Sequence, residues 1–255
     1  MKPVSWYKSL ALPKNRRQYG YFMIEGKRAV DQILTYHLGC VEELLCVGDA
    51  ALSPPPSTGI PVRIISEANM KSICASKTPQ GIAALVRIPP DAYTSKIPEQ
   101  SIPGGRILLL EHIQDPGNVG TLIRTAAAFG INGVIMSEQC ADPFSPKTIQ
   151  STAGSVLSVW IRKTDEYLLM VDELKSKHGY KLIAADLDGS ESYDFKGINR
   201  HILALGNEGS GLSGDTLNRC DHRIRIPIEE SGAESLNVAS SGAICMFILR
   251  PASVA

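Results

Sequence analysis

Residues 201–211 read HILALGNEGSG, an apolar run that ends abruptly in a glycine-rich segment. The run predicts a buried strand of a parallel sheet. The glycines predict a turn at its carboxyl end, where backbone without a Cβ can approach a ligand closely. A second strand at 223–226 and an apolar helix at 238–249 follow. Neighbouring strand ends of this kind form a cleft at the carboxyl edge of a parallel sheet, and we expect a small-molecule cofactor there.

Working outward, the carboxyl-terminal part alternates strands with helices, which is typical of a mostly parallel α/β sheet flanked by helices. The remaining predicted strands are 106–110, 133–136, 156–161 and 181–185, and the predicted helices are 118–129, 146–151 and 165–176. This part is predicted to be one domain, residues 105–255.

The amino-terminal part is predicted to be a smaller α/β domain, residues 1–90. Its expected helices are 4–12, 28–38 and 67–75, and its expected strands are 21–24, 41–47, 62–65 and 82–88, with a cationic loop at 14–18. A segment rich in proline, serine and glycine, residues 91–104, is predicted to be a linker between the two domains.

Composition indicates a globular protein without a membrane span. Of 255 residues, 44% are hydrophobic and 20% are charged, and no run approaches the about 18 apolar residues that a membrane helix needs. The N-terminus has no apolar signal core. The six cysteines are not spaced as metal ligands or as a disulfide scaffold, so reduced thiols, a cytoplasmic location and no metal site are expected.

The charge is zero overall but unevenly distributed. Residues 1–100 carry 12 basic and 8 acidic residues, whereas the remainder carries 14 and 18. The first 28 residues contain seven basic residues and one acidic residue. A basic end on a neutral protein predicts a polyanionic partner, although a solvated face explains the charge equally well.

Three segments carry the residues of chemical interest. The first is DPGNVG at 115–120, followed by Arg124 and Gly130. The second is LGNEGSGL at 205–212, and the third is IP at 226–227 with SLNVA at 235–239. Together, in this order and spacing, they resemble the three motifs of SpoU-type RNA 2′-O-ribose methyltransferases of the SPOUT superfamily.

The resemblance extends to the amino-terminal part. Lys14-x-Arg16, FMIEG at 22–26 and TPQGI at 78–82 look like the substrate-binding domain of the same family. That domain is similar to ribosomal proteins that bind kinked RNA helices. On this resemblance Lys14, Arg16 and Arg17 are the candidates for RNA phosphate contacts, which supply affinity and register but not sequence choice.

The family implies a deep trefoil knot in the carboxyl-terminal domain, although knots are nearly absent from proteins. It also implies a homodimer through that domain and S-adenosylmethionine as the cofactor. Structured RNA is the implied substrate, with large-subunit ribosomal RNA favoured and transfer RNA second. A ribose 2′-hydroxyl as methyl acceptor excludes DNA.

The family motifs assign four residues to the reacting centre. Arg124 is implied to activate or position the 2′-hydroxyl. Its guanidinium is a poor general base because its pKa exceeds about 12, so holding a phosphate or stabilising an alkoxide suits it better. A surface salt bridge is the alternative. Asn118 is implied to support the loop, or else caps the helix, and Glu208 and Asn237 either lie near the reacting atoms or fix loops.

Six residues are the candidates for cofactor contacts, mostly through backbone and apolar surface: Leu205, Gly206, Asn207, Ile226, Ser235 and Leu236. For Ile226 and Leu236, simple core packing is the alternative, and both roles can hold together. Asn207 stands where relatives often carry a small residue or serine.

Two other classes of function compete with the methyltransferase. One is a non-catalytic RNA-binding ribosome assembly factor on the same fold, which would not need the set of Asn118, Arg124 and Asn237. The other is a nucleotide-binding enzyme that uses 206–211 as a phosphate loop. That segment lacks the Lys-Ser/Thr of a P-loop and the full dinucleotide fingerprint, so the sequence disfavours it.

Overall fold

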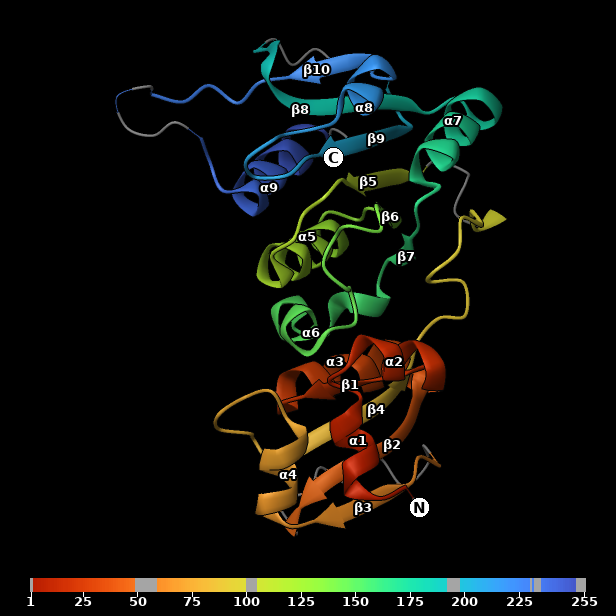
Figure 1. Ribbon diagram of the computed structural model, residues 1–255, viewed down its shortest axis with the longest axis vertical. Helices are drawn as coiled ribbons and strands as arrows, with labels where there is room; N and C mark the ends of the chain where they lie inside the picture. The colour runs from red at the N-terminus through yellow and green to blue at the C-terminus, as the bar shows by residue number, and fades with distance from the viewer. Residues whose placement is uncertain are drawn as a thin grey trace, which may run out of the picture. The chain divides into compact units, whose positions relative to one another are not determined.

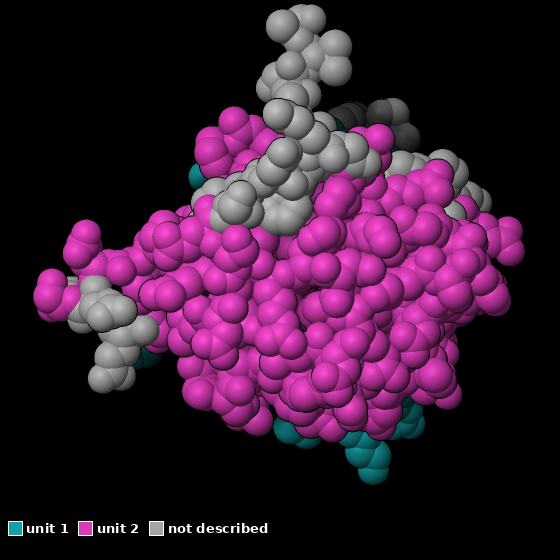
Figure 2. All heavy atoms as spheres, turned by 90° about the horizontal axis from the view of Figure 1, so that it is seen from above, with its two compact units in different colours: residues 1–90, 142–157 teal, residues 91–141, 158–255 magenta. Residues whose placement is uncertain are grey.

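A computed structural model describes residues 2–48, 59–99, 105–191, 198–229, 231 and 235–250. The chain divides into two compact units, which Figure 2 colours separately. The first unit comprises residues 1–90 and 142–157, and the second comprises residues 91–141 and 158–255. The division that the sequence suggested, at residues 90 and 105, does not anticipate that 142–157 groups with the amino-terminal residues.

The second unit is built on a six-stranded sheet in the order β10-β8-β9-β5-β6-β7 (Figure 1). Each neighbouring pair in it is parallel, which confirms the predicted parallel α/β sheet. The strands are β5 (Arg106–Leu110), β6 (Gly133–Met136), β7 (Trp160–Lys163), β8 (Lys181–Ser190), β9 (His201–Leu205) and β10 (His222–Ile224).

Helices cover both faces of this sheet. The helices are α5 (Pro116–Ala128), α7 (Tyr167–His178), α8 (Gly214–Asn218) and α9 (Val238–Ile248). Apolar residues of α7 share one core with Ile107 and Ile202. On the other face, Gly242 of α9 packs against Leu122 of α5 and Leu205 of β9. Successive side chains of a strand point to opposite faces, so α7 lies opposite to α5 and α9.

The first unit contains a mixed four-stranded sheet in the order β1-β4-β2-β3. Its strands are β1 (Tyr21–Glu25), β2 (Val41–Val47), β3 (Val62–Ile65) and β4 (Ile82–Arg87). Its helices are α1 (Val4–Ser9), α2 (Pro13–Tyr19), α3 (Lys27–Tyr36), α4 (Glu67–Ile73) and α6 (Pro146–Thr152), with short 3₁₀ turns at Leu38–Cys40 and Ser155–Leu157. The Phe22 and Phe144 rings, 5.1 Å apart, join β1 to the segment that leads into α6.

Two predicted elements are wrong. Residues 14–18 are not a loop but part of α2, which has Pro13 at its start and ends at Gly20 with φ +73°. Proline at the first helical position and glycine just beyond the end are ordinary helix boundaries. The predicted strand 156–161 is wrong in its first part, because residues 155–157 form a 3₁₀ turn and β7 begins only at Trp160.

The predicted linker differs in its first half. Lys163 N donates to Ala92 O at 2.9 Å, and Arg162 Nε donates to Lys96 O at 2.6 Å. These bonds pack residues near 91–99 on β7, and Ala92 is fully buried. The rest of the predicted linker, residues 100–104, lies outside the described residues.

Two observations bear on the expectations from composition. Among the described helices, none combines the length and apolar character needed to cross a membrane. All six cysteines are free thiols.

Candidate functional site

A cleft opens at the carboxyl ends of β9 and β10, beside residues 185–188 of β8. We call it the carboxyl-edge cleft, and its volume is about 420 Å³, within the range of small-molecule sites. The structure brings all six residues predicted to contact a cofactor to its lining: Leu205, Gly206, Asn207, Ile226, Ser235 and Leu236. Their role in binding remains a prediction, but their convergence at one strand edge is now a structural fact.

The segment 206–213 is called the glycine loop, and its residues 206–212 form one wall of this cleft. Asn207 and Gly211 exchange backbone hydrogen bonds of 3.0 and 2.9 Å, which folds the loop back on itself. A Cβ on Gly206 would lie 2.2 Å from the carbonyl carbon of Gly211, so only glycine fits there. The Asn207 side chain accepts from Gly209 N and donates to His112 O, which explains an asparagine at this position.

Three residues predicted from three separate motifs are joined by hydrogen bonds. Asn118 Nδ2 donates to Glu208 Oε1 at 2.7 Å, and Asn237 Nδ2 donates to Asn118 Oδ1 at 3.1 Å. We call this set the amide relay. Asp115, not Asn118, caps α5, because its carboxylate accepts from Asn118 N at 2.9 Å. Asn237 also caps α9, through Ala239 N and Ser240 N, which is the structural role that the sequence offered as an alternative, and its place near the reacting atoms remains a prediction.

Arg124 is the one predicted reacting residue that the structure leaves apart from the others. It lies on α5 and is exposed, about 9 Å along the helix axis from Asn118 at 1.5 Å per residue. It does not line the cleft. Within the described part of the chain, its side chain makes no hydrogen bond or ion pair, so the salt-bridge alternative finds no support. Its guanidinium is available to a ligand.

The charged residues that line the cleft are all acidic. They are Asp186, Asp188 and Glu208, and no lysine or arginine appears among the described lining residues. Arg223 reaches Asp186 at 3.3 Å and offsets one of these charges. An acidic cleft favours a cofactor that carries positive charge and disfavours phosphates. The phosphate-loop alternative is therefore further weakened.

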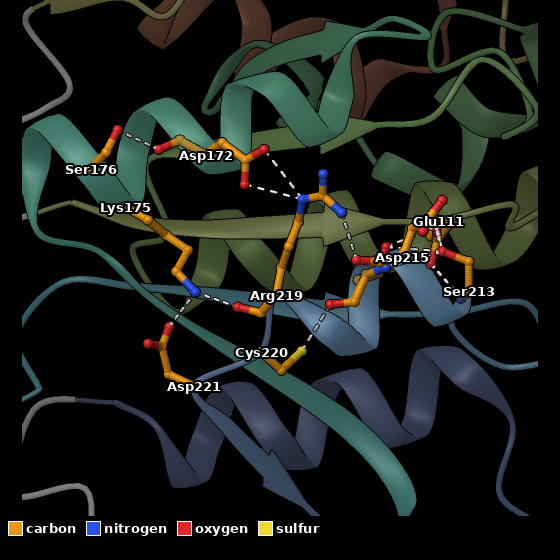
Figure 3. A network of polar contacts seen from close by, with 10 residues as sticks. Glu111, Asp172, Lys175, Ser176, Ser213, Asp215, Arg219, Cys220 and Asp221 are labelled. Carbon is orange, nitrogen blue, oxygen red and sulfur yellow. Dashed lines mark hydrogen bonds and ion pairs between the residues drawn. The ribbon is translucent and has the colours of Figure 1, made fainter.

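The sequence interpretation missed Glu111, which follows β5 directly and is fully buried. Figure 3 shows its carboxylate among donors from Ser213 and neighbouring residues. Burial acts to raise the pKa of Glu111, but hydrogen bonds from Tyr167, Ser213 and Thr216 outweigh it and hold the pKa below its usual value. A carboxylate at the end of a continuous apolar run was the available sequence signal.

In the first unit, the structure separates the three candidates for RNA contact. Lys14 and Arg17 are exposed on α2. Arg16 is 1% exposed and pairs with Asp142 at 2.5 Å, and it also donates to the Leu10 and Ala11 carbonyls. The prediction of an RNA contact is wrong for Arg16, because the helix turns this side chain into the interior, where protein acceptors already occupy it.

The parallel sheet and its carboxyl-edge cleft, bordered by the amide relay, define an α/β protein of the cofactor-binding class. Comparison with known families gives the particular one. Residues 105–247 match the SpoU rRNA Methylase family model, and residues 4–84 match the MRM3-like substrate binding domain. The chain belongs to the SpoU rRNA methylase family.

Relatives of known name cover nearly the whole chain. A 23S rRNA (guanosine(2553)-2′-O)-methyltransferase, RlmP, of Bacillus subtilis is 33% identical over 96% of this chain and 94% of its own length. A 23S rRNA (uridine(2479)-2′-O)-methyltransferase of Streptomyces viridochromogenes is 26% identical, over 95% of this chain and 86% of its own. The AdoMet-bound rRNA methyltransferase structure from Sinorhizobium meliloti superimposes with TM-score 0.80 at 28% identity, covering 96% and 92% of the two chains.

Proposed function

We propose that this protein is an S-adenosylmethionine-dependent RNA 2′-O-ribose methyltransferase that acts on large-subunit ribosomal RNA. The observation that carries the proposal is the amide relay, which joins all three motifs beside a cleft of cofactor size. The relatives named as 23S rRNA methyltransferases favour ribosomal RNA. Transfer RNA is the second candidate, since a relative from Synechocystis carries the name tRNA/rRNA methyltransferase.

The carboxyl-edge cleft fits S-adenosylmethionine in three respects. Its volume is sufficient, its glycine loop lines one wall with three glycines that leave the backbone uncovered, and its acidic lining suits a cationic ligand. Leu205, Gly206 and Ile226 are proposed to hold the adenosyl part. When bound, the cofactor supplies a methyl group on a positively charged sulfur, so that the leaving thioether needs no protonation.

The protein's own residues are proposed to orient the nucleophile. The amide relay fixes Asn118 at the start of α5, and Arg124 projects from the same helix. Its guanidinium would hold the phosphate beside the target ribose and stabilise the oxyanion as the 2′-hydroxyl loses its proton to solvent. In-line attack needs the oxygen about 3–3.5 Å from the methyl carbon, which this orientation serves.

The first unit is proposed to bind the RNA substrate, as the match to a substrate-binding domain suggests. Lys14 and Arg17 remain the candidates for phosphate contacts, because both are exposed on α2. On this basis residues 1–90, together with 142–157, are proposed as the substrate-binding part, and residues 91–141 and 158–255 as the catalytic part. Action on ribosomal RNA would place the protein in the cytoplasm.

A homodimer through α5 and α9 is part of the proposal. The apolar side chains of Ile244 and Phe247 on α9 are 38% and 53% exposed, and the Phe247 ring lies 6.3 Å from that of Phe129, which directly follows α5. Phe247→Asp should convert the dimer to a monomer in sedimentation equilibrium. Wild-type protein that sediments with the mass of a single chain would contradict the dimer.

We also propose that the second and third motifs form the deep trefoil knot of the family. The close packing of Gly242 in α9 against Leu122 of α5 and Leu205 of β9 supports it. An experimentally phased structure with a continuous trace through both motifs tests the knot, and an unthreaded trace would refute it.

The function is tested by methyl transfer from radiolabelled S-adenosylmethionine to large-subunit ribosomal RNA and to bulk transfer RNA in parallel. Label on ribosomal RNA, resistant to alkali at the modified linkage, is the expected result. If only transfer RNA is labelled, transfer RNA takes the place of ribosomal RNA as the proposed substrate. If calorimetry detects no cofactor binding, the RNA-binding assembly factor becomes the better account.

A further inference from the structure

We propose that Glu111 is a positioning residue for the cofactor, because its carboxylate fixes the position of the glycine loop, which forms one wall of the carboxyl-edge cleft. The inference rests on the proposed function, since the ligand of the cleft is taken to be S-adenosylmethionine. Glu111 itself does not line the cleft. It acts through the residues that do.

The carboxylate of Glu111 is saturated by donors. Oε1 accepts from Tyr167 OH at 2.5 Å, Ser213 Oγ at 2.7 Å and Thr216 Oγ1 at 2.9 Å. Oε2 accepts from the backbone N–H of Ser213 at 2.9 Å. The side chain is fully buried. One carboxylate therefore ties β5, α7 and the start of α8 to the end of the glycine loop.

The two ends of the glycine loop are anchored to the same corner of the chain. Glu111 N donates to Leu205 O at 2.9 Å just before the loop. Asn207 Nδ2 donates to His112 O at 2.9 Å, and Ser213 closes the far end on the Glu111 carboxylate. His112 has φ +57°, an uncommon conformation for a residue with a side chain, which aims its carbonyl at Asn207. The cleft-lining residues 206–212 are thus held at both ends by hydrogen bonds to Glu111 and His112.

Negative charge, and not only shape, is needed at this position. Every partner of the carboxylate is used as a donor, and both oxygens are occupied. Glutamine has the same shape, but on the Oε2 side its NH₂ group would face the Ser213 N–H, and on the Oε1 side it would displace the protons that the Tyr167, Ser213 and Thr216 hydroxyls now donate. A buried donor that loses its acceptor is costly, so the Ser213 end of the loop would shift in Glu111→Gln.

A purely structural role for Glu111 makes a different prediction. It would lower the melting temperature and the fraction of folded chains, but the folded chains would bind the cofactor with unchanged affinity. Isothermal titration calorimetry separates the two, because a lost folded fraction reduces the stoichiometry whereas a displaced loop weakens the Kd.

The test titrates the full-length protein with S-adenosylmethionine. For Glu111→Gln we expect a Kd at least tenfold weaker than wild type with near-normal stoichiometry. The KM for S-adenosylmethionine should rise by a similar factor, while kcat at saturation changes less than about threefold. The matched control is Asp172→Asn, which removes the negative charge that Asp172 offers to Arg219 at 3.0 Å, just after the C-terminal end of α8 (Figure 3), and it should keep the wild-type Kd.

An unchanged Kd in Glu111→Gln, with or without lower stoichiometry, would overturn the inference. If that variant does not fold, Tyr167→Phe takes its place, since it removes one donor and leaves the carboxylate. It should weaken binding two- to fivefold, and a wild-type Kd would again overturn the proposal. Wild-type protein that fails to bind S-adenosylmethionine would instead contradict the proposed function.

Discussion

The glycine loop of the second unit and helix α2 of the first unit were both singled out by their residue types, with opposite outcomes. In the glycine loop, Gly206 and Asn207 lie where the sequence placed them, at the lining of a cleft. In α2, Arg16 was expected on the surface and is buried against Asp142. Glycine and asparagine act through local backbone geometry, whereas the fate of an arginine depends on which partners the fold supplies.

Two arginines sharpen the contrast. Arg16 is 1% exposed and bonded to several acceptors, whereas Arg124 is exposed on α5. Charge and residue type alone did not tell the structural arginine from the one available to a ligand. Each variant below either breaks this contrast or makes it more exact.

The largest effect is expected for Arg16→Ala, which should lower the free energy of unfolding by about 3–5 kcal/mol, because it removes the cation that balances the largely buried charge of Asp142. Urea denaturation measures the loss. Lys14→Ala on the same helix is the control and should change stability by less than about 0.5 kcal/mol. If Arg16→Ala is as stable as wild type but has lost RNA affinity, Arg16 is an RNA-binding residue and not a structural one.

Arg124→Ala should do the reverse. We expect methyl transfer to fall by at least about 10², or about 2.7 kcal/mol, as for other groups that stabilise developing charge. The melting temperature should stay at the wild-type value, because no bond within the described chain is lost. Lys177→Ala, an exposed cation on α7, should leave the rate unchanged. A variant with full activity would remove Arg124 from the mechanism.

His201 extends the comparison to the second unit, where it is a buried polar side chain that no motif marks. It is 3% exposed, and burial together with the nearby Arg106 lowers its pKa to about 4. The unfolded chain binds a proton below about pH 6.5 and the folded chain does not until about pH 4. Stability should therefore fall by about 2 kcal/mol between pH 7 and pH 5.

Urea titrations at several pH values measure this loss. In His201→Gln the corresponding part of the pH dependence should disappear, whatever the variant does to stability at pH 7. If the variant keeps the wild-type slope between pH 7 and pH 5, other groups cause the acid sensitivity.

The smallest effect concerns the glycine loop itself. Gly206→Ala should weaken S-adenosylmethionine binding about tenfold, or 1.4 kcal/mol, because its Cβ would meet the Gly211 backbone at 2.2 Å. Gly214→Ala is the matched control, since a Cβ there meets nothing within 4 Å. Equal affinities of the two variants in calorimetry would show that the close approach at Gly206 is not needed for binding.

Much of the framework follows from local sequence. The predicted bounds of five strands coincide with the observed ones: 41–47, 62–65, 106–110, 133–136 and 201–205. Each is a run rich in apolar residues, and glycine, proline or polar residues flank most of them, so that strand and turn are specified within a few positions. The residues of the cleft lining were found for the same reason, because they sit at strand ends and helix starts.

What the tertiary structure alone decided concerns polar side chains with distant partners. Arg16 meets Asp142 across 126 positions, Glu208 meets Asn118 across 90, and Glu111 meets Ser213 across 102. The grouping of residues 142–157 with the first unit is of the same kind. A charge can be buried only where the fold places a partner of opposite charge or a hydrogen-bonding group beside it. A local sequence pattern does not reveal that distant partner. The sequence thus determined the sheet and the loops of the cleft, and the fold determined which charges hold it together.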